Sequence, residues 1–129
     1  MKILLDTHAL LWCLSGDKRL SKKARKCYED SEELIFSVVS LWEIGIKLGL
    51  RRRDFALDGA WWRSVPETLV AQGARRLNVE PEHCQVVADL PLHHRDPFDR
   101  MLIAQAVVSD CRILSIDEQF DAYAVRRIW

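Results

Sequence analysis

The chain has 129 residues, 49% of them hydrophobic, which is enough to bury a core of ordinary size, and we predict one domain over residues 1–129. Lysine plus arginine and aspartate plus glutamate number 19 each, and this formal net charge of zero argues against tight binding of a polyanion by bulk charge alone. The sequence shows no Cys-x-x-Cys pair, no signal peptide and no apolar run near the roughly 20 residues of a membrane span, so we expect a reduced, cytoplasmic protein.

The chain opens with a strand and two helices. The apolar run at residues 2–5 predicts a buried parallel strand. Asp6 or Thr7 can cap the next helix, which ends near Gly16. Ser21 starts a second helix with one basic face, which is more typical of a solvated surface than of an RNA contact.

A second strand leads into a third helix. Residues 34–37 form another short apolar run, and Ser40 and Glu43 then match a Ser-x-x-Glu capping box at the start of a helix. Arg51–Arg53 close that helix, where cations interact favourably with the helix dipole. This pattern predicts that Glu43 lies in the first turn of the helix.

The middle of the chain continues the alternation. Residues 58–73 predict one or two helices, and Ser64 with Glu67 matches a second capping box. A third strand is predicted over residues 76–79. It stops at Glu80–Pro81, where a further helix begins.

The last part of the chain keeps the same order. A polar loop at residues 93–100 turns into a long apolar helix over residues 101–108, with the proline of that loop at its first turn, and a strand follows at residues 112–115. Asp117 comes soon after that strand, and residues 126–129 are suited to an edge strand. Alternating strands and helices predict an α/β protein with a central parallel sheet covered on both faces.

Four acidic residues lie where a strand gives way to a helix. They are Asp6, Glu43, Asp99 and Asp117. Because the carboxyl ends of parallel strands line up along one edge of a sheet, we expect these side chains to meet in one crevice. Carboxylates packed together repel one another, so such a cluster needs compensating protons, cationic side chains or a bound cation. Oxygen ligands favour Mg²⁺ or Mn²⁺ over zinc, and no cysteine–histidine spacing supports a zinc site.

Each acid also has a simpler structural explanation. Asp6 and Asp117 can be N-caps, and Glu43 can complete a capping box. Asp99 can favour a helix N-terminus, where negative charge is worth about 0.3–1 kcal/mol. For any one residue this explanation is the better one. Capping does not require a carboxylate at four sheet-edge positions, however, because serine, threonine and asparagine also cap helices.

Four stretches of the chain together carry a family pattern. They are residues 4–12 (LLDTHALLW), 40–44 (SLWEI), 94–106 (HRDPFDRMLIAQA) and 115–117 (SID). They resemble PIN-domain ribonucleases of the VapC toxin type. The similarity spans nearly the whole chain, and the first and third stretches are specific rather than generic. The resemblance implies a single PIN domain with a compact three-layer α/β/α sandwich.

The resemblance also implies an activity and partners. Proteins of this family cut single-stranded RNA with Mg²⁺, for which Mn²⁺ can substitute, and act as toxins of type II toxin–antitoxin pairs. The expected partners are the RNA substrate, a cognate VapB-like antitoxin and a second copy of the chain in a homodimer. The sequence does not identify which RNA is cut.

Residue by residue, the family's acidic quartet matches Asp6, Glu43, Asp99 and Asp117. Phosphodiester hydrolysis requires an activated water and neutralised phosphoryl oxygens, which one or two divalent ions can supply. We expect Asp6 and Asp99 to contact the main ion. Glu43 and Asp117 then hold a second ion or orient the water, and Asp117 occupies the most variable position in the family.

Three further residues are expected close to these ligands. Thr7 or Ser115 donates a hydrogen bond nearby. Asp96 lies three residues before Asp99. It either shares the role given to Asp99, caps the same helix or supports the metal ligands without contacting the ion itself. We favour Asp99 because it directly precedes the apolar helix, as the family's third acid does.

Several other residues have two readings each. His93 and His94 are candidates for phosphate contact, but paired loop histidines are more often plain exposed polar residues. Arg51–Arg53 and Arg75–Arg76 are candidates for RNA contact, although exposed solubilising charge explains any one of them at least as well. Trp61–Trp62 suit the core and a protein interface about equally.

Two rival functions stay open. A metal-dependent phosphatase or phosphotransferase with a nucleophilic aspartate is expected to carry a second aspartate two residues after the first, but that position is His8. The late strand also ends at Ser115 rather than at a lysine. The other rival is a non-catalytic PIN-like interaction module, and the presence of all four acids argues against it.

Overall fold

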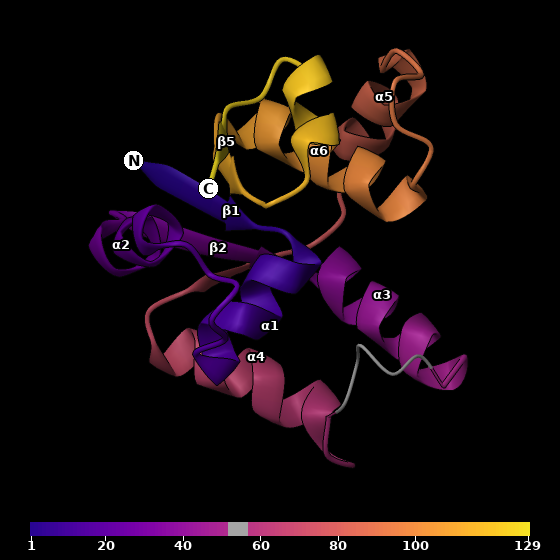
Figure 1. The fold of residues 1–129 in the computed structure, drawn as a ribbon. Helices are drawn as coiled ribbons and strands as arrows, with labels where there is room; N and C mark the ends of the chain where they lie inside the picture. The colour runs from indigo at the N-terminus through magenta and orange to yellow at the C-terminus, as the bar shows by residue number, and fades with distance from the viewer. Residues whose placement is uncertain (52–56) are drawn as a thin grey trace.

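The computed structural model describes residues 1–51 and 57–129 (Figure 1). The elements follow in this order: β1 (Lys2–Leu5), α1 (Thr7–Ser15), α2 (Lys22–Asp30), β2 (Glu33–Ser37), α3 (Val38–Gly49), α4 (Trp61–Ala71), β3 (Arg75–Leu77), α5 (Pro81–Asp89), α6 (Pro97–Ser109), β4 (Arg112–Leu114), the 3₁₀ helix η1 (Glu118–Ala122) and β5 (Arg127–Ile128). Among the described residues, no helix is long and apolar enough to cross a membrane.

The strands form one parallel sheet in the order β3-β2-β1-β4-β5. Side chains alternate across this sheet, so Leu4 joins a hydrophobic cluster with α6, whereas Ile3 and Leu5 join a second cluster with α1, α2 and α4. Figure 1 shows α5 and α6 on one side of the sheet and α1 and α4 on the other. The predicted α/β/α sandwich with a central parallel sheet is confirmed.

Predicted helix starts are confirmed at two caps. The Asp6 carboxylate accepts a hydrogen bond from the Ala9 N–H at 2.8 Å and so begins α1. The Ser21 hydroxyl accepts from the Ala24 N–H at 3.0 Å and begins α2. The predicted edge strand is also present, because β5 pairs with β4 at the end of the strand order.

The capping box predicted at Ser40 and Glu43 is wrong. α3 begins at Val38, directly after β2, and its cap is Ser37, whose hydroxyl accepts from the Val39 N–H at 3.1 Å. Ser40 and Glu43 lie inside the helix instead. Two serines three residues apart compete for the cap, and the strand ends at the first of them, so Glu43 lies further along α3 than predicted.

The capping box predicted at Ser64 and Glu67 is also wrong. α4 is one helix with Pro66 inside it, so this segment forms one element rather than two. A proline at that depth removes a backbone hydrogen bond. Leu69, which is fully buried in the core cluster, packs α4 onto the rest of the fold and compensates for that loss.

The helix that carries Asp99 has Pro97 in its first turn, as predicted, and Asp96 is its cap. α6 starts at Pro97 because the Asp96 carboxylate caps it, accepting from the N–H groups of Phe98 and Asp99 at 2.8 and 3.2 Å. The C-terminal part of the predicted polar loop is therefore helical. Asp99 lies in the first turn, where the backbone fixes its direction.

Candidate metal centre

The carboxyl ends of the strands bring the four predicted acids toward one edge of the sheet. Asp6 follows β1 and Asp117 follows β4, whereas Glu43 lies on α3, into which β2 leads directly. Asp99 belongs to the first turn of α6, which follows α5 and a loop, so its predicted place directly after a strand is wrong. Because α3 contacts both α1 and α6, the elements that carry the acids are neighbours at this edge (Figure 1).

Asp99 lies among these negative charges. Its side chain is 17% exposed. Burial, followed by the charge of four nearby carboxylates, raises the pKa of the Asp99 carboxyl to about 8. Those carboxylates belong to Asp96, Asp6, Glu43 and Asp117. The structure therefore brings the predicted quartet into one region.

Asp6 is held at the junction of β1 and β4. Its side chain is buried, and this burial raises the pKa of the carboxyl to about 6, although a hydrogen bond with the Ser115 side chain opposes the shift. The Ser115 hydroxyl also accepts the Asp117 N–H at 3.0 Å. Ser115 thus links two of the acids from the end of β4.

Glu43 is buried and engaged by two protein groups. The Thr7 hydroxyl donates to Oε1 of Glu43 at 2.7 Å. Lys47, one turn further along α3, forms an ion pair with Oε2. The sequence reasoning missed Lys47, although the spacing of an acid and a lysine four residues apart on a helix is the signal that marks such a pair.

The prediction that both loop histidines are exposed is wrong for His94. His93 is exposed, but the His94 side chain is only 8% exposed. Its Nε2 lies 2.8 Å from Oδ2 of Asp99 and 3.3 Å from Oδ2 of Asp117. Nε2 is aligned for a hydrogen bond with neither oxygen, so it is a buried polar atom without a conventional partner.

These groups fit a divalent cation. Within residues 1–51 and 57–129, His94, Asp99 and Asp117 each offer a ligand atom, and these atoms lie within 4.8 Å of one another. The carboxylates supply the hard oxygen donors that Mg²⁺ and Mn²⁺ prefer. A buried nitrogen without a conventional partner beside them is the kind of polar group that a bound ligand or a rearranged carboxylate satisfies.

The other candidate residues have simpler places. The Arg75 side chain forms an ion pair with Glu33 in the neighbouring strand, and Arg76 is exposed. Arg51 is exposed just after α3, while Arg52 and Arg53 lie outside the described residues. Trp61 packs against the core, whereas Trp62 is 58% exposed, so the pair divides between the two readings.

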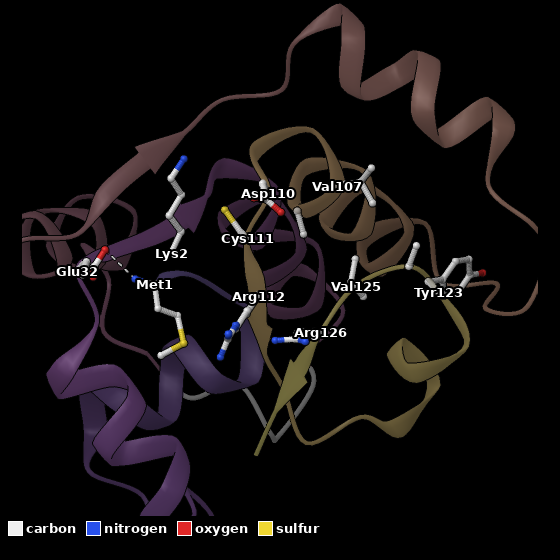
Figure 2. A pocket seen from close by; sticks show the side chains of 12 residues that line it. Met1, Lys2, Glu32, Val107, Asp110, Cys111, Arg112, Tyr123, Val125 and Arg126 are labelled. Atoms are coloured by element: carbon white, nitrogen blue, oxygen red, sulfur yellow. Dashed lines mark ion pairs between the residues drawn. The ribbon is translucent and has the colours of Figure 1, made fainter.

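A separate hollow of about 680 Å³ opens at the opposite edge of the sheet (Figure 2). Lys2, Arg112 and Arg126 line it, and they lie at or beside the amino ends of β1, β4 and β5. None of the four acids is among the described residues that form its lining. This hollow is therefore distinct from the candidate metal centre.

Three solved structures share the fold over most of their length. The first is VapBC2 from Rickettsia felis bound to a fragment of promoter DNA. It is 8% identical, with a TM-score of 0.71 over 98% of this chain and 97% of that chain. DNA-bound VapBC from Salmonella typhimurium is 13% identical, with a TM-score of 0.70 over 98% and 96%. FitAcB from Neisseria gonorrhoeae is 19% identical, with a TM-score of 0.63 over 97% and 95%. At these identities the likeness shows the fold alone.

Sequence comparison gives the family directly. No curated protein matches the chain. The family model described as PIN domain, however, matches residues 3–126, which is nearly the whole chain. This match agrees with the family resemblance of the four sequence stretches and with the parallel sheet that carries the acids. The chain therefore belongs to the PIN domain family.

Proposed function

We propose that this PIN domain is a divalent-metal-dependent endoribonuclease that cleaves single-stranded RNA and acts as the toxin of a type II toxin–antitoxin pair. The convergence of four carboxylates in one region carries the proposal. They belong to Asp6, Glu43, Asp99 and Asp117. PIN domains are generally nucleases. Several proteins with this fold were solved as VapBC or FitAB assemblies, which supports a VapC-type toxin with a VapB-like antitoxin.

The cation in this proposal is Mg²⁺, for which Mn²⁺ can substitute. Asp6, Asp99 and Asp117 would hold it, because the charges of Asp6 and Asp117 reach Asp99 and raise its pKa, and this negative charge needs compensation. When bound, the ion lowers the pKa of a water molecule and offsets negative charge on the scissile phosphate.

The neighbouring side chains have tasks of their own. Ser115 fixes the Asp6 carboxylate. Glu43 orients the attacking water, because each carboxylate oxygen has a second lone pair beyond the one engaged by Thr7 or Lys47. Lys47 also offsets the charge of Glu43, so the acidic cluster carries less net negative charge when RNA approaches.

Cleavage of total cellular RNA tests the nuclease. Purified protein with Mg²⁺ or Mn²⁺ should give discrete fragments, whereas EDTA or the Asp99→Asn substitution should abolish them. Asp110→Asn is the matched control, because Asp110 is an exposed aspartate at the far end of the same helix. Fragments that persist in EDTA or with Asp99→Asn would rule out the proposed centre. No cleavage by a folded, metal-binding wild type would instead support a non-catalytic PIN module.

Co-expression tests the toxin role. Expression of the wild-type chain should arrest growth, and the product of an adjacent short reading frame should restore growth and co-purify with the chain. Asp99→Asn should not arrest growth but should still bind the antitoxin, because Asp99 serves chemistry in this proposal. We also propose a homodimer, which sedimentation would report as twice the monomer mass. Growth arrest that requires no acid would contradict the nuclease-toxin assignment.

A further inference from the structure

We infer that His94 is a positioning residue of the metal centre, which donates a hydrogen bond from Nε2 to the carboxylates of Asp99 and Asp117 and holds them together for the cation. The inference rests on the proposed function, because it assumes that these carboxylates bind a divalent ion. It adds a residue outside the acidic quartet to the centre.

The contacts of the imidazole ring assign its two nitrogens. Nδ1 accepts a hydrogen bond from the Asp96 backbone N–H at 3.4 Å. A neutral imidazole carries one proton, so in this arrangement the proton lies on Nε2. Nε2 is 2.8 Å from Asp99 and 3.3 Å from Asp117, and a protonated nitrogen at that place is a donor rather than a metal ligand.

The two carboxylates are the acceptors within reach of this buried donor. Nε2 is aligned with neither oxygen, and a buried donor left without a partner is unfavourable. The terminal torsion of an aspartate is broad, so a small rotation of Asp99 or Asp117 completes the bond at little cost. A carboxylate held in this way has its other oxygen directed for metal binding, as hydrogen bonds to ligating carboxylates generally do.

The backbone around His94 is fixed from two sides. The Tyr123 hydroxyl accepts the His94 N–H at 2.7 Å and donates to the Pro91 carbonyl at 2.8 Å. The Arg100 guanidinium donates to the carbonyls of His94 and Leu90 at 3.3 and 3.2 Å. We call these two side chains the Arg100–Tyr123 clamp. It converts an irregular loop into a rigid support for one imidazole.

Ring packing fixes the remaining freedom of the side chain. The His94 imidazole meets the Phe120 ring edge to face, with centroids 6.1 Å apart and planes at 83°. Phe120 is fully buried on η1, the element capped by Asp117. The His94 ring therefore packs against η1. This short helix begins after Asp117, which is one of the two carboxylates that His94 holds.

Mn²⁺ binding in the absence of RNA tests the inference. His94→Leu should weaken Mn²⁺ binding about 10–100-fold, the loss that accompanies removal of an outer partner of a metal ligand. His94→Gln, whose amide N–H can reach the place of Nε2, should stay within about threefold of wild type. His93→Gln is the matched control and should bind as the wild type does, because His93 is exposed. Thermal unfolding of each variant separates loss of binding from loss of fold.

Electron paramagnetic resonance of bound Mn²⁺ separates a positioning residue from a ligand. No histidine nitrogen coupling should appear in the wild type. A nitrogen coupling that both substitutions remove would overturn the inference, because His94 would then be a ligand. Equal losses in His94→Leu and His94→Gln, or wild-type affinity in His94→Leu, would overturn it too while leaving the nuclease proposal intact.

A second variant covers the case in which His94→Leu does not fold. Tyr123→Phe removes only the hydroxyl that anchors the His94 N–H and should weaken Mn²⁺ binding by a smaller factor, about threefold. Unchanged affinity in Tyr123→Phe would overturn the inference. If the wild type binds no Mn²⁺ at all, the proposed function is contradicted, and this inference falls with it. RNA cleavage that survives EDTA would identify that case.

Discussion

The two edges of the sheet carry their charges in opposite ways. At the carboxyl edge, Asp6 and Glu43 are almost fully buried and Asp99 is mostly buried. At the amino edge, the hollow of about 680 Å³ is lined by exposed groups such as Lys2 and Arg126. One edge therefore holds buried acids that repel one another, and the other holds exposed charges of both signs that water solvates.

This difference in burial distinguishes a candidate functional site from an ordinary surface hollow. At the carboxyl edge, burial raises the pKa of Asp6 to about 6 and that of Asp99 to about 8, and such perturbed groups concentrate at functional sites. The exposed charges of the amino edge are hydrated and screened by salt. Buried and incompletely compensated charge, rather than the size of a hollow, marks the candidate metal centre.

The largest effect should come from Asp6→Asn. Asparagine still caps α1, because its side-chain oxygen can accept the Ala9 N–H, but it cannot bind a divalent ion as a carboxylate does. We expect RNA cleavage to fall about 1,000-fold or more, equivalent to about 4 kcal/mol of lost transition-state stabilisation, with little change in melting temperature. Single-turnover cleavage rates and calorimetry measure the two quantities.

Asp110→Asn provides the amino-edge counterpart. Asp110 is exposed, lines the amino-edge hollow and has a positive φ that asparagine also tolerates. The Asp110→Asn variant should cleave RNA at the wild-type rate. Equal activity losses from Asp6→Asn and Asp110→Asn would erase the functional difference between the two edges.

The next effect concerns the compensation of Glu43. Lys47→Met leaves the buried Glu43 carboxylate without its lysine partner, and breaking a buried pair in this way costs several kcal/mol. Because the Lys47 side chain is 18% exposed, we expect the free energy of unfolding to fall by about 3 kcal/mol. Urea denaturation measures the change.

A second substitution checks the cause of that loss. Glu43→Gln in the Lys47→Met background removes the stranded charge and keeps an oxygen for the Thr7 hydroxyl. The double variant should recover most of the lost stability. If it is no more stable than Lys47→Met alone, the lysine acts through packing of its aliphatic chain and not through charge.

Asp99 should make stability depend on pH. Its carboxyl has an ordinary pKa of 3.8 when unfolded and about 8 when folded, so between these values the folded chain binds the extra proton. The contribution of Asp99 to the free energy of unfolding is fully present below pH 3.8 and is lost as the pH rises through 8. Asp99→Asn stays neutral, so we expect it to exceed the wild type in stability by on the order of 2 kcal/mol at pH 8 and to match it near pH 4.

Unfolding from pH 4 to 9 in EDTA measures this dependence. Asp110→Asn should follow the wild-type curve throughout, because its carboxylate is exposed. Curves for Asp99→Asn and wild type that stay parallel over the whole range would mean that Asp99 is not buried among like charges. Added Mn²⁺ should stabilise the wild type at pH 8 and not Asp99→Asn, because the ion binds the charged carboxylate of the folded state.

Local sequence signals predicted the elements that position the acids. The runs at β1 and β4 and the caps Asp6 and Ser21 each depend on neighbouring residues, so a single sequence reveals them. The box at Ser40 failed because two competing caps are locally equivalent, and only the end of β2 decides between them. Local signals give the element but not always its first residue.

The environment of His94 shows what a single sequence does not contain. Its burial depends on the Tyr123 hydroxyl, which lies 29 residues later in the chain, and on the Phe120 ring. No periodicity or spacing near His94 encodes those partners. Tertiary contacts therefore decide which of two adjacent histidines faces the acids, while Asp6 and Asp117 could be predicted from their places after β1 and β4.

The smallest effect should come from the amino edge. A polyanion such as RNA is drawn to exposed cations, and Arg126→Glu reverses one of them in the amino-edge hollow. β4, which runs from this hollow toward the acids, has three residues, and at about 3.3 Å each they span about 10 Å. That distance matches the Debye length of about 10 Å at 0.1 M salt, so salt screens most of the interaction and we expect the KM for RNA to change less than about twofold. A KM that rises tenfold, while the variant stays folded, would mean that the RNA extends across the amino edge as well, and the two edges would then form one continuous binding surface around a single set of buried acids.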